Sequence, residues 1–183
     1  MKRNLSALLR GCCATLVLMA FAAVPTSAAE IDDADALKGV KVGKAVFDIS
    51  LGDPAKLALH LAVIKETHQG LVKQGVKPDL IVLFRGPAVS LVSKKRAPAA
   101  EPAAKPDETA RFAAELNSMS AKEITRQIEE LKGLGVKFEV CGVSTRLLKV
   151  DNATVLPATR VVANTFISLI GYENRGYAIV PIM

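Results

Sequence analysis

Apolar and polar positions follow two different rhythms along the chain, one typical of strands and one typical of helices. Residues 44–50 alternate as a strand does, and residues 79–84 hold a continuous apolar run, typical of a strand buried on both faces of a parallel sheet. Between them, Asp53 and Pro54 give a helix start signal and Gly75 a stop signal. The helix between these signals has one apolar face, formed by Leu57, Leu61, Ile64 and Leu71.

A proline- and alanine-rich stretch at residues 93–109 interrupts this alternation. It contains Pro98, Pro102 and Pro106, so we expect a solvated insertion within the domain instead of a packed element. After it, Ser120 and Glu123 form a capping-box signature. The pattern therefore predicts a helix that begins near Ser120 and ends at Gly133.

The remaining residues continue the alternation of strands and helices. Strands are predicted at 136–141, 159–163 and 176–181, with an amphipathic stretch at 164–170. Five strands with intervening helices predict an α/β fold, a three-layer α/β/α sandwich with a mostly parallel five-stranded sheet. Residues 30–183 are long enough to form it as a single domain with its own core.

The N-terminus has the features of a cleaved secretory signal over residues 1–29. Residues 12–24 are apolar but too short to span a bilayer, small residues at 26–29 suit a cleavage site, and the preceding positive charges come from Lys2, Arg3 and Arg10. We therefore expect a periplasmic protein with no stable membrane anchor after cleavage. The alternative is a lipoprotein anchor at Cys12, but the apolar run follows this cysteine instead of preceding it.

Composition and charge narrow the function classes. Removal of the signal takes Lys+Arg minus Asp+Glu from 24 minus 18 to 21 minus 18, a net charge near +3. With no Trp and few aromatics, this charge gives no case for a nucleic-acid partner. His60 and His68 lack an acidic companion at ligand spacing, and the Gly133-Leu134-Gly135 turn precedes a strand instead of following one. The sequence therefore predicts neither a metal site nor a cofactor.

Cys141 is the single thiol that remains once the signal segment is removed. Exported proteins usually carry cysteines in even numbers as disulfides, so a lone thiol in an oxidising compartment is unusual. Cys141 ends a predicted strand just before Gly142, where N–H groups of a following helix can favour the thiolate. The alternative is an inert packing cysteine.

The ends of the predicted strands bring further polar residues toward Cys141. Sites in parallel sheets lie beyond the carboxyl ends of the strands. Asp48 and Ser50 lie at the end of the first strand, and Arg85 follows the second. We expect these side chains to meet Cys141 at one edge of the sheet.

Three segments give the chain a resemblance to a known family. They are IVLFRGPAVSLV from residue 81, EELKGLGVKFEVCGVSTRLLKV from residue 129, and VLPATRVVANTFISLIGYENRGYAIVPI from residue 155. With the order of the elements, they resemble the DsrE/DsrF-like family, in particular its exported single-domain branch, over roughly residues 42–183. Arg85 stands where many members of this branch have a histidine.

This resemblance implies a homotrimer or homohexamer that carries sulfane sulfur as a persulfide on Cys141, for a sulfur donor and acceptor that the sequence does not identify. Such a carrier needs a thiolate and groups that hold an anion. Arg85 or Arg146 would be the cation, and N–H groups from Gly142 to Ser144 the anion nest. The alternative is a non-catalytic oligomeric protein that binds a small ligand or a partner and keeps Cys141 for packing.

Overall fold

The structure, a computed structural model, describes residues 32–94 and 108–183, with side chains of the second range from residue 119 onward. The predicted signal segment, and residues 95–107 of the predicted insertion, lie outside the described residues. The chain from Asp33 to Met183 forms one compact unit. None of the helices in the described ranges combines the length and apolar character needed to cross a membrane.

Five strands of the described ranges form one sheet in which every neighbouring pair is parallel, in the order β4-β3-β2-β1-β5. This confirms the predicted sheet and makes it parallel throughout. The central strands β1 and β2 pair over eight residues each, whereas β4 has only three. The strands are β1 (Val42–Ile49), β2 (Lys77–Phe84), β3 (Lys137–Cys141), β4 (Arg160–Val162) and β5 (Ala178–Ile182).

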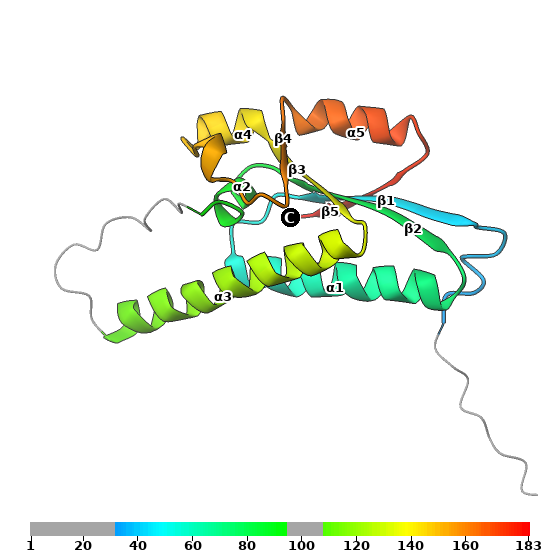
Figure 1. Ribbon diagram of the computed structural model, residues 1–183, viewed down its shortest axis with the longest axis horizontal. Coiled ribbons are helices and arrows are strands. Elements are labelled where there is room, and N and C mark those ends of the chain that lie inside the picture. The colour runs from blue at the N-terminus through cyan, green and yellow to red at the C-terminus, as the bar shows by residue number, and fades with distance from the viewer. Residues whose placement is uncertain (1–31, 95–107) are drawn as a thin grey trace, which may run out of the picture. The chain divides into compact units, whose positions relative to one another are not determined.

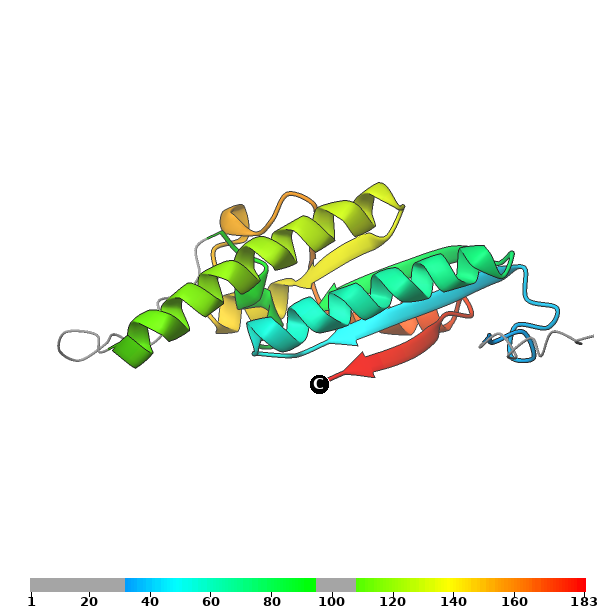
Figure 2. The same ribbon diagram turned by 90° about the horizontal axis from the view of Figure 1, so that it is seen from below.

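Helices cover both faces of this sheet (Figure 1). The long helices α1 and α3 lie side by side on one face, as the view from below shows (Figure 2), and α4 and α5 lie on the other. The predicted three-layer sandwich is thereby confirmed. The helices are α1 (Pro54–Lys73), α2 (Ala88–Leu91), α3 (Glu108–Gly133), α4 (Gly142–Leu147) and α5 (Thr165–Glu173), with a 3-10 turn at Asn152–Thr154.

Helix α1 begins where the sequence predicts. The Asp53 carboxylate accepts hydrogen bonds from the N–H groups of Ala55 at 2.8 Å and Lys56 at 3.0 Å, which pairs two N–H groups that the first turn leaves without helical partners. Pro54 follows as the first helical residue. Proline breaks no helical hydrogen bond there, because an N–H group in the first turn has no acceptor within the helix.

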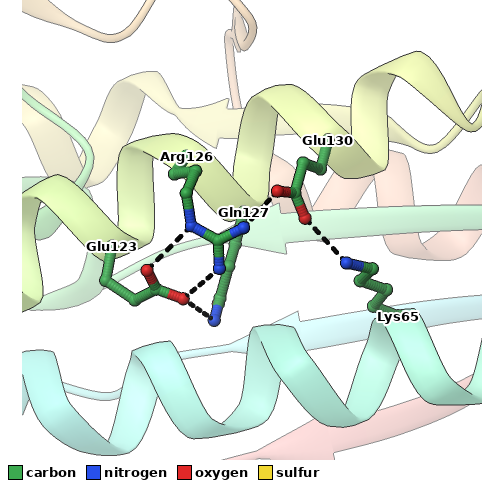
Figure 3. Close-up of polar contacts among 5 residues, drawn as sticks. All are labelled: Lys65, Glu123, Arg126, Gln127 and Glu130. Carbon is green, nitrogen blue, oxygen red and sulfur yellow. Dashed lines mark hydrogen bonds and ion pairs between the residues drawn. The ribbon is translucent and has the colours of Figure 1, made fainter.

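Helix α3 begins earlier than predicted, so the capping-box prediction at Ser120 is wrong. The helix already starts at Glu108, because the run ETARFAAEL consists mostly of good helix formers. Glu123 does not act as a capping residue. Its carboxylate accepts hydrogen bonds from Arg126 and Gln127 within a chain of polar contacts that continues through Glu130 to Lys65 on α1 (Figure 3).

The alternation of side chains along each strand divides the buried residues into two clusters. Phe84 and Val140 pack toward α1 and α3, whereas Val46 and Leu83 pack with Tyr172 of α5. By the same alternation, three polar or reactive side chains are directed toward the face that carries α4 and α5, namely Asp48, Glu139 and Cys141. The sheet therefore places its functional groups on that face.

Candidate functional site

The carboxyl ends of β1, β2 and β3 bring three predicted site residues to one edge of the sheet. Asp48 is the second-last residue of β1, Arg85 directly follows β2, and Cys141 is the last residue of β3. The Arg85 N–H donates a hydrogen bond to Ile49 O at 2.9 Å, which extends the pairing of β1 and β2 to the start of the loop. These strands are adjacent, so the three side chains gather as the sequence predicts.

Asp48 holds the Arg85 side chain with two hydrogen bonds. Arg85 Nε lies 2.7 Å from Asp48 Oδ1, and Nη2 lies 3.0 Å from Oδ2, a bidentate geometry that fixes the guanidinium plane. The hydrogen bond to Asp48 raises the pKa of Arg85, burial opposes the rise, and the charges of Asp48 and Cys141 add to it. Arg85 is therefore a fixed cation close enough to Cys141 for the two charges to interact.

The Cys141 thiol is buried yet readily ionised. The residue is 4% exposed, and this burial raises the pKa of the thiol. The side chains of Ser144 and Thr165, followed by the backbones of the same two residues, favour the thiolate, outweigh the burial and lower the pKa to about 7. Near neutral pH the thiolate, which is the nucleophilic form, is therefore accessible.

Ser144 is held in place by the loop that follows β2. The Gly86 N–H donates a hydrogen bond to Ser144 Oγ at 2.9 Å, which leaves the Ser144 proton free for the sulfur. Gly86 has φ of 51°, a left-handed conformation that glycine adopts without strain. Ser144, predicted as part of an anion nest, therefore contributes mainly through its hydroxyl.

Thr165 is a site residue that the sequence analysis missed. It is fully buried at the first turn of α5, and its Oγ1 makes no well-aligned hydrogen bond to any described group. The hydroxyl nevertheless lies close enough to Cys141 to lower the pKa of the thiol. The signal for it was the Asn164 N-cap, whose Oδ1 accepts from the Phe166 N–H at 3.0 Å and marks where α5 starts.

Gly142 is required by close packing between α4 and the end of β4. A Cβ atom at this position would lie 2.8 Å from Val162 O and 3.3 Å from Ala163 O, inside the normal contact distance. The glycine after the cysteine therefore lets the segment that leads into Thr165 approach the thiol. Its predicted role in an anion nest gains no support, because the backbone hydrogen bonds that lower the thiol pKa come from Thr165 and Ser144.

Two further predicted residues lie at the margin of the site or away from it. The Ser50 N–H donates a hydrogen bond to Ile182 O at 2.9 Å, which ties the end of β1 to β5. The Ser50 side chain lies near Gly86, since a Cβ atom added to Gly86 would be 3.9 Å from Ser50 Cβ. Arg146 is exposed in the last turn of α4. Among the described residues, no hydrogen bond or ion pair joins Arg146 to Cys141, so the cation near the thiol is Arg85.

Phe166 completes the surface above the site. Its ring lies 5.6 Å from the Arg85 guanidinium carbon, a cation–π arrangement, while more than half of the residue stays exposed. Arg85 is thus held between a carboxylate and an aromatic ring, beside a thiol with a lowered pKa. This arrangement can hold a small anion next to a sulfur nucleophile.

A family model matches residues 44–182, which include the whole cysteine site and nearly all of the sheet. The chain belongs to the DsrE/DsrF-like family. This family is associated in general with sulfur relay. The resemblance of the three sequence segments to DsrE/DsrF-like proteins is thereby confirmed at the level of the family.

Relatives of this DsrE/DsrF-like chain include an uncharacterized protein of Aquifex aeolicus (strain VF5), 28% identical over 141 residues. That alignment covers 75% of this chain and 55% of the relative, so the chain spans about half of the relative's length. Among solved structures, the protein of unknown function MTH1491 from Methanobacterium thermoautotrophicum superposes with a TM-score of 0.55 at 16% identity, covering 76% of this chain and 98% of that one. The ychN protein of E. coli gives a TM-score of 0.46 at 12% identity, covering 77% and 100%.

Proposed function

We propose that this protein carries sulfur as a persulfide on Cys141. The observation that carries the proposal is the lowered pKa of the thiol, about 7, at a position that is otherwise buried. Burial alone would raise the pKa and leave an inert thiol, so the donors that reverse its effect favour a reactive role. A thiol whose pKa lies near the ambient pH is also close to the optimum for attack on sulfur.

The proposed reaction is a transfer of sulfane sulfur to the thiolate. With thiosulfate as donor, Cys141 Sγ attacks the outer sulfur, a new S–S bond forms, and the S–S bond of thiosulfate breaks. Sulfite leaves with the electron pair, so the products are the Cys141 persulfide anion and sulfite, and the total charge is conserved. In the second step an acceptor thiolate attacks the outer sulfur of the persulfide, a new S–S bond forms on the acceptor, and the S–S bond to Cys141 breaks. The Cys141 thiolate leaves with the electron pair and is ready for another cycle.

Two groups near Cys141 suit the persulfide anion better than they suit the thiol. Arg85, fixed by Asp48, supplies a positive charge that interacts with the charge on the sulfur. The buried Thr165 hydroxyl lacks a well-aligned acceptor and can donate to a second sulfur atom added to Cys141. In this proposal Cys141 is the nucleophile, and Arg85, Ser144 and Thr165 stabilise the anion.

A second candidate function follows from the low exposure of the thiol. A residue that is 4% exposed offers a donor little access, which favours the alternative of an oligomeric small-ligand-binding or interaction protein with a packing cysteine. The two functions differ in what the thiol does while the protein is folded. A carrier thiol reacts in the native state, whereas a packing thiol reacts only after unfolding.

Intact-mass analysis of the folded protein after incubation with thiosulfate, and separately with polysulfide, tests the carrier function. We expect wild type to gain the mass of one or more sulfur atoms and the Cys141→Ser variant to gain none. Iodoacetamide should block the gain and should react in the native state at a rate that follows a pKa of about 7. A native thiol that stays unmodified and unalkylated until denaturant is added would overturn the proposal in favour of the packing role.

The assembly proposed with this function is a homotrimer or homohexamer. Three large apolar side chains of α5 support it, because a packed monomer would leave them in water. Their exposure lies between 57% and 66%, at Phe166, Ile167 and Ile170. Native mass spectrometry should give trimers or hexamers, and Ile167→Asp should shift the protein toward monomers. A monomeric wild type at micromolar concentration would contradict the assembly.

The location proposed with this function is the periplasm. The support is the charged and apolar pattern of residues 1–29, which resembles a cleaved signal. Expression of the full chain should give a periplasmic product whose N-terminus, read by mass spectrometry, lies near residue 29 or 30. Recovery of the uncleaved chain from the cytoplasm would contradict this location.

A further inference from the structure

A second candidate site lies along the same strand as Cys141, in a hollow of about 540 Å³ on the other side of the β4 pairing. The three residues of β4 pair with Glu139, Val140 and Cys141, so β4 leaves the first two residues of β3 uncovered on that side. The end of α3, the segment before β4 and Tyr172 of α5 surround the gap. A volume of this size is within the usual range for small-ligand sites.

The hollow is lined by the buried carboxylate of Glu139, one oxygen of which has no hydrogen-bond donor among the described residues. Glu139 is 2% exposed, and its Oε1 accepts hydrogen bonds from Tyr172 OH at 2.9 Å and Arg160 Nη2 at 2.5 Å. Its Oε2 is buried and accepts no hydrogen bond from any described group. A buried carboxylate oxygen without a donor is costly, so a ligand that brings an N–H group there gains a strong, charge-assisted bond.

The rim of the hollow has the opposite charge. Lys132 and Lys137 line it together with Arg160. Lys132 lies 3.5 Å from the Pro157 carbonyl, and Lys137 forms an ion pair with the Asp79 carboxylate at 3.5 Å. Arg160 and Lys137 are each paired with a carboxylate, whereas no ion pair joins Lys132 to a carboxylate of the described residues. Both lysines are exposed and can contact an anionic group at the rim. A ligand that matches these charges has a hydrogen-bond donor near Glu139 and an acidic group near the lysines of the rim.

We propose that this hollow binds a small amphoteric molecule of the α-amino acid type. The amino group of the ligand donates to Glu139 Oε2, and its carboxylate faces Lys132 and Lys137. This function is independent of the sulfur chemistry proposed for Cys141, because the hollow contains neither Cys141 nor the Arg85 cation. A simple amine would lack a partner for the lysines, and a simple acid would leave Glu139 Oε2 unpaired.

NMR titration of ¹⁵N-labelled full-length protein tests this site, with each of the common amino acids as probe at up to about 20 mM, a range that detects weak millimolar binding. We expect at least one to give saturable shifts centred on the amides of Glu139, Thr159 and Tyr172. The matching acid without an amino group loses the bond to Glu139, and the N-acetyl derivative loses the positive charge that strengthens this bond, so both should bind roughly tenfold more weakly. The absence of saturable shifts with every amino acid would overturn the proposal.

Matched variants separate the site from a general charge effect. Glu139→Gln keeps an acceptor for Tyr172 and Arg160 but presents an amide N–H₂ in place of Oε2, so it should bind the amino acid roughly tenfold more weakly. Glu129→Gln, an exposed position on α3, makes the same charge change and should bind as wild type does. Equal affinity of the two variants would overturn the proposal, as would shifts centred on Cys141 and Ser144.

A substitution of Lys132 tests the site separately, in case the Glu139→Gln variant does not fold. Lys132→Gln lies on the surface of α3 and should weaken binding of the amino acid while leaving binding of the corresponding amine without a carboxylate unchanged. An equal loss for both probes would overturn the assignment of the carboxylate to the rim. Cys141→Ser should bind the amino acid as wild type does, so failure of the sulfur-carrier function leaves this test intact.

Discussion

The backbone N–H of Gly86 donates a hydrogen bond to the Ser144 hydroxyl at 2.9 Å, which joins the loop after β2 to the short helix after Cys141. The bond crosses between segments 58 residues apart in the chain. Because the hydroxyl accepts from Gly86, its own proton remains available to the sulfur. The acidity of Cys141 therefore depends on the geometry of a neighbouring strand as well as its own.

Replacement of Ser144 by alanine should make Cys141 less acidic. Ser144→Ala removes the largest of the effects that lower the thiol pKa from its ordinary value toward about 7. If the pKa rises by one unit, the thiolate fraction at pH 7 falls roughly fivefold. The measurement is the rate of iodoacetamide alkylation of the native protein between pH 6 and 10. Thr125→Ala, on the exposed side of α3, serves as the control and should not move the profile.

Replacement of Thr165 by valine should act on the persulfide more than on the thiol. Valine has nearly the same shape, so Thr165→Val removes the buried hydroxyl without opening a cavity. We expect a small rise in the thiol pKa and a clearly faster loss of sulfur from the persulfide to cyanide, measured as thiocyanate release. If the persulfide lasts as long in this variant as in wild type, the Thr165 hydroxyl does not bind the outer sulfur.

The ion pair between Asp48 and Arg85 should matter for stability as well as for reactivity. Asp48→Asn leaves a partly buried guanidinium without its bidentate partner, so we expect a loss of about 1–3 kcal/mol in the free energy of unfolding, measured in urea. Asp35→Asn, at an exposed position, should change it by less than about 0.5 kcal/mol. Equal effects of the two substitutions would contradict the importance of the pair.

Two glycines on the same face of the sheet should respond to alanine in opposite directions. Gly142→Ala places a Cβ atom 2.8 Å from Val162 O, and we expect a loss of about 1–3 kcal/mol of stability from overpacking. A Cβ atom on Gly171, within α5, meets nothing within 4 Å, so Gly171→Ala should stabilise the protein by up to about 1 kcal/mol. Thermal and urea unfolding of both variants gives the comparison.

The stability of the protein should rise between about pH 7 and 9 because of Cys141. The folded state lowers the pKa of the thiol to about 7 from an ordinary value of 9.0, so the folded protein releases the proton at a lower pH than the unfolded chain does. The resulting stabilisation is complete above the unfolded pKa and is lost as the pH falls through 7. The difference in unfolding free energy between wild type and Cys141→Ser should grow over this interval. A pH-independent difference would contradict the lowered pKa.

The sequence predicted the elements of the sheet well because the information is local. Continuous apolar runs, as in residues 79–84, and the Asp53-Pro54 start signal do not depend on distant parts of the chain. The convergence of Asp48, Arg85 and Cys141 was predictable too, since parallel strands end at the same edge of a sheet. The start of α3 was not, because a Ser and a Glu three residues apart fit equally well inside a helix that good helix formers extend.

Contacts that depend on the order of the strands were beyond the reach of the sequence. Thr165 reaches Cys141 because β4 lies beside β3, and the hollow around Glu139 exists because β4 is shorter than its neighbour. Neither the order of the strands nor the short length of β4 is encoded in a local sequence pattern. Arg146 illustrates the converse, since it was a candidate for the cation near Cys141, but it lies exposed in the last turn of α4.

Helix α5 links the two ends of the face that it covers. Thr165 in its first turn acts on the proton affinity of Cys141, while Tyr172 in its last turn holds the carboxylate of Glu139. The helix is only nine residues, or roughly 14 Å, long, so these two contacts lie about two turns apart on one short element. A change in the position of the helix would therefore alter the surroundings of Cys141 and of Glu139 together. The pKa of the Cys141 thiol and the hydrogen bond to the Glu139 carboxylate therefore both depend on the position of α5, and a substitution that shifts this helix should affect both.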